Sequence, residues 1–398
     1  MKLLSVEDAR ARMLAGLAPL GVERVPLAKA RGRFLAEAVL ATRDQPPFPA
    51  SAMDGWAVRA EDGEGLRKIL GESAAGHGFA GQVGREEAVR IFTGAAVPAG
   101  ADAVVIQENA RREGDRVFIP AVTHPRHIRP AGLDFRADDR LLEAGVRLDP
   151  WRLSLVAAAG LAAPAVFVQP GMVILPTGEE VVEPGGAPGP FQIFNSGSTA
   201  LTALAESWGC RATALPPAGD NEAAIAHAVS ETGGDLIVTL GGASVGDHDL
   251  VKPALARLGL NLIVESIAVR PGKPTWFGTL GDGRRVLGLP GNPASALVCA
   301  ELFLRPILRA LQGAQPGPRI VTARAEEDLP ANGEREHWMR ARLTHGADGV
   351  LWVRPLRDQD SSLVTIFADA DALVRRVRQA PAAAAGETVE VLILERLS

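Results

Sequence analysis

Between residues 172 and 312, short apolar runs alternate with longer amphipathic stretches, and this alternation constrains the fold more than any other feature of the 398-residue chain. The apolar runs predict strands at 172–176, 211–216, 235–240, 261–269 and 284–290. The amphipathic stretches predict helices at about 197–208, 221–231, 249–258 and 293–312. Strands that alternate with helices form an open, mostly parallel sheet covered on both faces. We therefore predict a multidomain α/β protein with a central doubly wound sheet.

The flanking segments have a different pattern. Short β-like runs separated by Gly, Pro and Asp predict a small β-rich domain, and further short strands are expected around 338–343, 349–353 and 388–394. Helices are expected at about 6–18 and 150–159. We expect four domains: a linking domain of 1–42 plus 146–168, a β-rich domain of 43–145, the α/β domain of 169–314 and a C-terminal β-barrel-like domain of 319–398.

Charge and composition exclude several classes of protein. Lys and Arg number 42 against 47 Asp and Glu, and no basic stripe is present, so a nucleic-acid partner is not expected. Cys210 and Cys299 lie in apolar segments, which disfavours both a disulfide framework and a cysteine metal site. The N-terminus lacks the apolar core of a signal peptide, and the most apolar stretch, 153–168, is interrupted by Gly160 and Pro164. We expect a cytoplasmic protein with no membrane partner.

A glycine-rich turn follows the third predicted strand. Adjacent Gly241 and Gly242 let the backbone approach a bound group closely, and successive N–H groups there can form an anion-binding nest. The acidic residues Asp247 and Asp249 come directly after it, as they would if a divalent cation bridged a phosphate to carboxylates. A plain strand-to-helix turn with Asp249 as N-cap explains the pattern equally well.

Two proline-containing turns are also candidates for anion binding. Gly291 and Asn292 precede Pro293 at the start of the long helix, where the first N–H groups of the helix are free to point at an anion. The alternative is that the proline only makes the start of the helix rigid. Arg270 and Lys273 are two cations held by prolines, and a rigid cationic turn suits an oxyanion, although a solvated basic turn is the alternative.

Carboxylates follow several of the predicted strands. Glu180 and Asp220 could join Asp249 in an acidic cluster at one rim of the sheet, with the oxygen ligands that Mg²⁺ prefers. Each of them could instead be a helix cap or a solvated charge. In the first half of the chain, the residue pattern alone predicts only structured loops around 51–58 and 90–94.

Eight segments, taken in order, resemble the MoeA family of molybdenum cofactor biosynthesis, which includes bacterial MoeA and the E-domain of gephyrin. They are SAMDGWAV, IFTGAAVPAGADAVVIQE, IRPAGLDFRADDRLLEAG, PTGEEV, FNSGSTAL, TLGGASVGDHD, RPGKPTWFG and LPGNPASA. The resemblance implies a molybdopterin molybdenumtransferase, which takes adenylylated molybdopterin and molybdate and, with Mg²⁺, cleaves the pyrophosphate linkage and releases AMP. It also implies a homodimer whose site is shared between subunits.

The resemblance also implies roles for individual residues. Asp54 and Thr93 would reach into the partner's site, and Glu180, Asp220 and Asp249 would be the metal-associated carboxylates. Residues that hold phosphate or oxyanion groups would include Gly241, Gly242, Ser244, Gly291, Asn292 and Ser295. The molybdate-facing turn would consist of Arg270, Lys273 and Pro274, joined by Arg340 and Ser361 or Ser362. The family often has Lys where this chain has Arg270, and arginine presents a planar fork where lysine presents a point charge.

Two other functions are compatible with the resemblance. One is the adenylylation of molybdopterin, carried out by relatives that share the central sheet, and the other is a non-catalytic scaffold like gephyrin. A molybdopterin adenylyltransferase is the expected transient partner. Molybdate and tungstate cannot be distinguished from the sequence, because the two oxyanions have nearly the same size and charge.

Overall fold

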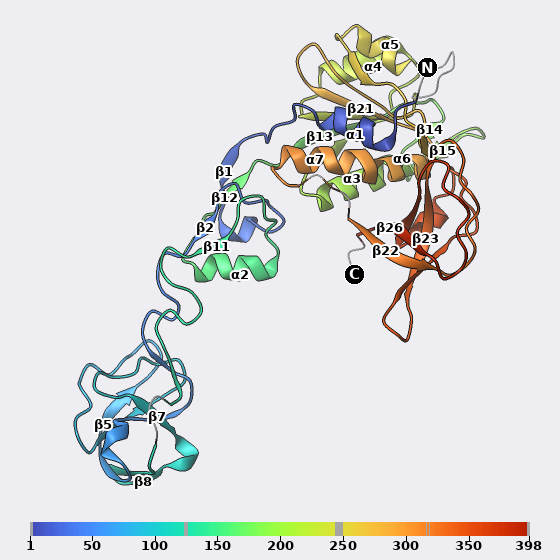
Figure 1. Ribbon diagram of the computed structural model, residues 1–398. Helices are drawn as coiled ribbons and strands as arrows, with labels where there is room; N and C mark the ends of the chain where they lie inside the picture. Colours follow the sequence, from blue (N-terminus) through green and yellow to red (C-terminus); the bar gives the residue numbers. More distant parts are fainter. Residues whose placement is uncertain (1–2, 123–125, 243–249, 316, 318, 396–398) are drawn as a thin grey trace. The chain divides into compact units, whose positions relative to one another are not determined.

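The structure, a computed structural model, describes residues 3–122, 126–242, 250–315, 317 and 319–395 (Figure 1). The chain divides into two compact units. Unit 1 consists of Met1–Glu23, Gly32–Ala36 and Ala165–Ser398, and unit 2 of Arg24–Arg31 and Glu37–Pro164. The four-domain division is finer than this and stays a prediction.

Unit 1 contains a six-stranded central sheet. Its order is β16 (Arg211–Ala214), β13 (Gly171–Pro176), β17 (Leu236–Leu240), β21 (Arg285–Leu289), β20 (Trp276–Thr279) and β18 (Asn261–Val264). The first four of these strands are parallel, whereas β20 runs antiparallel to both of its neighbours. The central sheet is therefore mixed, with its antiparallel strands gathered at one edge.

Two sequence predictions for this sheet were wrong. No strand was expected at β20, because Trp276 follows directly after a proline-rich turn. The segment 261–269 was expected to be one strand, but β18 ends at Val264, and β19 (Val269–Arg270) pairs with a strand of a different sheet. Leu262 and Val264 are also out of register with β20, so the irregular pairing begins within β18.

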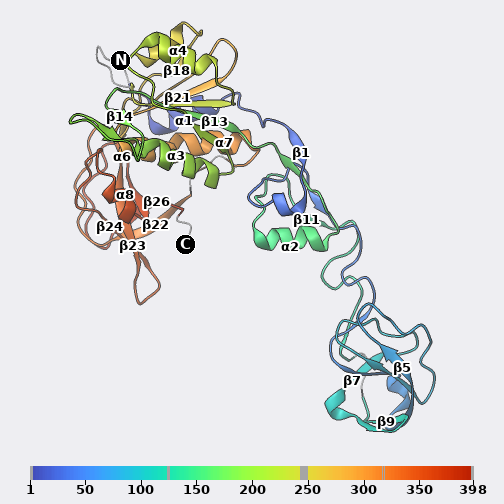
Figure 2. The same cartoon turned by 180° about the vertical axis from the view of Figure 1, so that it is seen from behind.

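Helices cover both faces of the central sheet (Figure 2). One face packs on α1 (Val6–Leu14), α3 (Ser196–Ser207), α6 (Pro293–Cys299), the π-helical segment η4 (Ala300–Leu304) and α7 (Arg305–Leu311). The other packs on α4 (Glu222–Ser230) and α5 (Val251–Ala256). Successive strand residues serve opposite faces, as Ile174 and Leu175 show.

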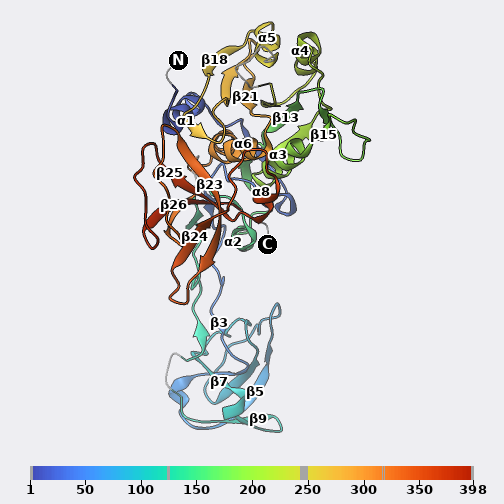
Figure 3. The same ribbon diagram turned by 90° about the vertical axis from the view of Figure 1, so that its right-hand side faces the viewer.

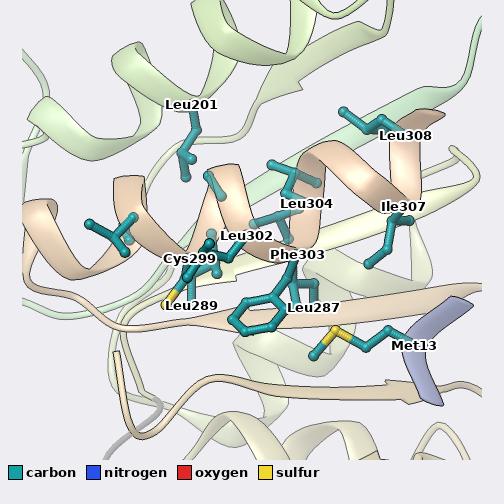
Figure 4. Close-up of a cluster of buried hydrophobic side chains, with 14 of the residues drawn as sticks. Met13, Leu201, Leu287, Leu289, Cys299, Leu302, Phe303, Leu304, Ile307 and Leu308 are labelled. Atoms are coloured by element: carbon teal, nitrogen blue, oxygen red, sulfur yellow. The ribbon is translucent and has the colours of Figure 1, made fainter. Parts of the chain in front are cut away.

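The larger of these two cores lies around the helix that follows β21 (Figure 4). We expected one helix at 293–312; the structure has α6 and α7 joined by η4. Pro306 has no N–H to donate to the preceding turn, which accounts for the local departure from α-helical bonding. Met13 of α1 is buried in the same core, so the first helix packs with the α/β region.

The C-terminal part of unit 1 is a closed sheet (Figure 3). Its strands are β22 (Ile320–Ala325), β23 (Glu336–His345), β24 (Leu351–Pro355), β25 (Ala372–Arg376) and β26 (Thr388–Ile393), with β19 on the edge. Because β23 pairs with both β24 and β25, the five strands form a barrel-like ring around small apolar residues such as Ala341 and Val374. The short helix α8 (Thr365–Asp369) contacts β23.

Unit 2 contains a further six-stranded sheet. Its order is β7 (Ala103–Ile106), β4 (Gly55–Val58), β6 (Glu87–Ile91), β5 (Gly65–Ser73), β9 (Arg116–Ile119) and β8 (Arg111–Glu113). Helix α2 (Pro150–Ala158) is capped by Asp149, whose carboxylate accepts the Arg152 N–H. The shorter elements of the chain are β1 (Val22–Arg24), η1 (Leu27–Lys29), β2 (Val39–Leu40), β3 (Ala50–Ser51), η2 (Ala60–Asp62), η3 (Gln107–Asn109), β10 (Ile128–Arg129), β11 (Arg140–Leu142), β12 (Ala165–Phe167), β14 (Val181–Val182) and β15 (Ile193–Phe194).

None of the helices in the described part of the chain combines the length and the apolar character needed to cross a membrane.

Candidate active site

Three parallel strands of the central sheet end side by side. Pro176 of β13 is in register with Leu240 of β17, which is in register with Leu289 of β21. Backbone bonds continue past this line: the Thr177 N–H donates to Leu240 O (2.9 Å) and the Gly241 N–H to Leu289 O (3.2 Å). The turns that follow the three strands are thereby brought together at the carboxyl edge of the sheet, where open α/β sheets bind ligands.

A pocket of about 430 Å³ lies at this edge. It is lined by Thr177, Gly178, Glu180, Asp220, Gly241, Gly242, Pro274, Pro290, Gly291 and Asn292. Most of these residues were predicted as site residues from the sequence. The additional ones, Thr177, Gly178 and Pro290, belong to the same turns, and their place at the ends of strands is the signal that could have found them.

The glycines of the pocket are required by close packing. Gly241 and Gly242 have φ values of +100° and +57°, which side chains rarely adopt. A Cβ on Gly241 would lie 2.7 Å from Thr177 O, and one on Gly291 would lie 3.4 Å from the Gly241 Cα. The predicted site residues Ser244 and Asp249 lie outside the described residues.

Glu180 and Asp220 are exposed carboxylates on the wall of this pocket. Gly178 has a φ of +123°, and a side chain there would overlap the Glu180 carboxylate, so glycine leaves room for this group. Among the described residues, no group of three or more His, Cys, Asp or Glu is arranged to hold a metal ion, and Asp249 is not among them. Two carboxylates nevertheless suit Mg²⁺, which usually binds one or two of them together with waters and substrate phosphates.

The C-terminal domain contributes Ser361 to the start of α6. The Asn292 amide donates to Ser361 Oγ (2.8 Å), and the Ala294 N–H donates to Ser361 O (3.1 Å). The prediction that the first N–H groups of this helix are free is therefore wrong for Ala294. Ser362 instead bonds to Asp360 through its N–H and hydroxyl, and Ser295 is buried in α6 and does not line the pocket.

Arg340 is a fully buried cation that bonds to Asp360, the residue before Ser361. Its Nη2 donates to Asp360 O (2.9 Å), and its guanidinium lies over the Phe367 ring, 6.0 Å from the centroid. Its Nε and Nη1 have no hydrogen-bond partner in the described part of the chain. Burial lowers the pKa of Arg340, while the charges of Asp358 and Asp360 oppose this effect. An unpaired buried donor costs about 1–3 kcal/mol, and an oxyanion is the natural group to satisfy it.

The cationic turn 270–274 is fixed by packing against α6. Gly272 has a φ of +115°, and a Cβ there would overlap Cys299 Sγ. The Thr275 hydroxyl donates to the same sulfur at 3.1 Å, and burial raises the pKa of Cys299 to about 12, so this thiol is structural. Arg270 and Lys273 are exposed on the turn, and Pro274 lines the pocket.

His337 is a buried residue that the sequence did not single out. It is the register partner of Arg270 between β19 and β23. Burial, which is the largest cause, and the charges of Arg270, Arg340 and Arg335 together lower its pKa to about 4. The imidazole is therefore neutral at pH 7, among three cations.

Asp54 and Thr93 belong to unit 2 and lie together. The Thr93 N–H and hydroxyl both donate to Asp54 Oδ1, at 2.7 and 2.8 Å, and these two bonds lower the pKa of Asp54. Gly55, next to Asp54, is enclosed by β6 and β7 so closely that a Cβ would overlap Val105 O. These contacts explain why the two separate motifs SAMDGW and FTG converge.

Arg90 supports this pair, and the sequence did not single it out. Its Nη1 donates to Gly55 O (3.0 Å) and its Nη2 to Gln107 Oε1 (2.5 Å). The guanidinium lies over the rings of Trp56 (5.4 Å) and Phe92 (4.9 Å). Arg90 thereby fixes the strand that carries Asp54.

Models of known protein families match the chain along almost its whole length. Three family models fit in order: the MoeA N-terminal region (domain I and II) over residues 4–160, a probable molybdopterin binding domain over 173–310, and the MoeA C-terminal region (domain IV) over 322–394. The central sheet with its edge pocket thus coincides with the region described as molybdopterin-binding. Fold and site define a multidomain α/β protein of the molybdopterin-binding class.

Individual relatives agree with this. A molybdopterin molybdenumtransferase from Haemophilus influenzae is 34% identical, over 98% of both chains, and one from Nostoc sp. is 35% identical, over 82% of this chain and 78% of its own. The crystal structure of a molybdopterin biosynthesis MoeA protein from Pyrococcus horikoshii superimposes with a TM-score of 0.83 at 30% identity, covering 99% of this chain and all of that one. The chain belongs to the MoeA family, which confirms the resemblance stated from the sequence.

Proposed function

We propose that this chain is a molybdopterin molybdenumtransferase, acting in molybdenum cofactor biosynthesis. It takes adenylylated molybdopterin and molybdate, cleaves the pyrophosphate linkage, releases AMP and leaves molybdenum on the dithiolene. The relatives of nearly equal length carry this name, and the alternatives of adenylyl transfer and scaffolding are not favoured. The observation that carries the proposal is the glycine-walled pocket at the carboxyl edge of the central sheet, with the carboxylates of Glu180 and Asp220 on its wall.

Cleavage of a pyrophosphate needs positioning and neutralisation of charge more than covalent help from the protein. Backbone N–H groups of the turns after β17 and β21, other than the Gly241 N–H that bonds to Leu289 O, would hold phosphate oxygens. Arg270, Lys273 and Arg340 would hold molybdate together with Ser361. Mg²⁺, when bound by Glu180 and Asp220 with Asp249, would neutralise charge on the pyrophosphate. Both reactive groups thereby meet at one edge of the sheet.

The remaining parts of the proposal concern the assembly. We expect a homodimer in which Asp54 and Thr93 of one subunit serve the pocket of the other, and transient contact with a molybdopterin adenylyltransferase that delivers the substrate. We place the protein in the cytoplasm. No helix in the described residues is long and apolar enough to cross a membrane.

The test is AMP release by the purified protein from adenylylated molybdopterin, with Mg²⁺ and molybdate. The Arg340→Met variant should lose at least about 100-fold in molybdate-dependent rate, because a buried charge-assisted contact is removed. Arg342→Met is the matched control, since Arg342 is exposed on the same strand and pairs with Asp369. If the wild-type protein releases no AMP above a protein-free control, the proposed function is wrong.

A further inference from the structure

We propose that Asp54 and Thr93 recognise the pterin ring of the substrate, accepting hydrogen bonds from the two adjacent N–H donors on its pyrimidine edge. The inference rests on the proposed function, because that function supplies a pterin as ligand. It assigns the pair to the pterin end of the substrate and not to the phosphate or molybdate end.

The hydrogen bonds within the pair leave only acceptors facing outward. Asp54 is ionised, so Oδ1 accepts both bonds and the Thr93 hydroxyl must be the donor in the second of them. Within the described part of the chain, Asp54 Oδ2 receives no hydrogen bond. The free Oδ2 and the lone pairs of Thr93 Oγ1 therefore form an edge that can accept hydrogen bonds and cannot donate them.

Arg90 lies beside the pair, and two of its N–H donors are engaged within unit 2. Its two Nη groups bond to Gly55 O and Gln107 Oε1, and its faces lie over Trp56 and Phe92. The positive charge of Arg90 helps to keep Asp54 ionised. The Gln107 N–H also bonds to Asp54 O (3.0 Å), so the backbone that carries the carboxylate is held at two points.

An edge that can only accept hydrogen bonds suits some chemical groups of this substrate and not others. A pterin presents a ring N–H beside an exocyclic amino group, which matches a carboxylate oxygen beside a hydroxyl oxygen. Phosphate and molybdate present acceptors, which Asp54 would repel. Adenine presents its amino group beside a ring acceptor, so only half of its edge would be matched.

The experiment compares two small probes, a pterin and the corresponding lumazine, in which oxygen replaces the amino group. Their binding to the full-length protein is measured by calorimetry or by quenching of ligand fluorescence, which requires no turnover. The wild-type protein should prefer the pterin by about ten-fold or more, because the lumazine oxygen would face the carboxylate unpaired. Asp54→Asn should remove this preference, since its amide offers a donor in place of an acceptor.

Two further variants separate recognition from folding. Thr93→Val should weaken pterin binding, whereas Thr93→Ser, which keeps the hydroxyl, should restore it. Asp115→Asn removes an exposed carboxylate in the turn between β8 and β9 of the same unit and should leave the preference unchanged.

The outcomes also separate this inference from the proposed function. Equal affinity of the wild-type protein for the two probes would overturn the inference even if AMP release is normal. An Asp54→Asn variant that keeps its preference for pterin but has a raised KM for molybdate or Mg²⁺ would likewise overturn it, because the carboxylate would then face the anion end. Loss of AMP release with an intact pterin preference would overturn only the proposed function.

Discussion

The pocket at the edge of the central sheet and the Asp54–Thr93 pair are built by opposite means. The pocket is shaped by backbone, at glycines such as Gly241 and Gly242, where a positive φ and close neighbours leave no room for a side chain. The pair consists of two side chains bonded to one another on the surface of a separate sheet. A change in the pocket wall therefore disturbs folding and binding together, whereas a change in the pair should affect binding alone.

The largest expected effect comes from adding a methyl group to the turn 270–274, which carries Pro274 of the pocket wall. Gly272→Ala should lower the free energy of unfolding of unit 1 by about 3 kcal/mol or more, because it combines a positive φ with overlap on Cys299 Sγ. Gly283→Ala is the control, since Gly283 has a φ of +89° with open space around it, and should lose only about 1 kcal/mol.

Both variants would be measured by urea denaturation followed by tryptophan fluorescence. Adding Cys299→Ala to Gly272→Ala should recover part of the loss, as expected for residues in contact. Equal losses for Gly272→Ala and Gly283→Ala would show that the turn is not held against α6 in the way described.

His337 should give the next largest effect, which depends on pH. Its pKa is lowered from 6.5 to about 4 in the folded protein, so the unfolded chain binds more protons between these values. The contribution of His337 is therefore constant above about pH 6.5, and stability is lost as the pH falls from 6.5 to 4, by about 2–3 kcal/mol in total.

His337→Gln should flatten the dependence of stability on pH within this window. The measurement is the urea midpoint at intervals between pH 4 and 7.5, with His345→Gln, at the exposed end of the same strand, as the control. An unchanged slope in His337→Gln would mean that other groups cause the loss of stability in acid.

Ser361→Ala should have the smallest effect on stability. It therefore tests whether the Ser361 hydroxyl contributes to folding or to molybdate binding. It removes one exposed hydrogen bond to Asn292, worth about 1 kcal/mol or less, while its backbone bond to Ala294 remains. The KM for molybdate should rise several-fold, whereas Ser362→Ala, whose hydroxyl bonds to Asp360, should leave it unchanged. A rise in both variants would indicate a general disturbance of the 358–362 loop.

The sequence predicts those parts of the molecule whose structure is determined by residues close together in the chain. The strands β13, β17 and β21 were located to within a residue or so, because continuous buried runs bounded by glycine and proline have few alternative structures. The turns after them were found for the same reason. β20 was missed because the proline-rich turn before Trp276 suggested that the irregular segment continued. An antiparallel strand also needs no helix before it, so the alternation of strands and helices does not reveal it.

The residues around the sites were predictable only where a motif carried them. Arg90 directly precedes the IFTG segment, but neither it nor His337 was predicted as a site residue, because their partners come from strands β4 and β19, far away along the chain. The pairing of Asp54 with Thr93 likewise depends on the register between β4 and β6, which sequence spacing does not determine. Ser361 reaches α6 through a long-range contact between two domains of unit 1.

The position of β19 has a mechanical consequence. The chain leaves the central sheet at Val264, adds Val269 and Arg270 to the edge of the C-terminal ring, and returns to the central sheet at Trp276. The cationic turn is thus a short tether with its two ends tied to different sheets. The C-terminal ring cannot slide along the central sheet without dragging Arg270 away from Pro274, so the geometry of this turn depends directly on how the two sheets are docked.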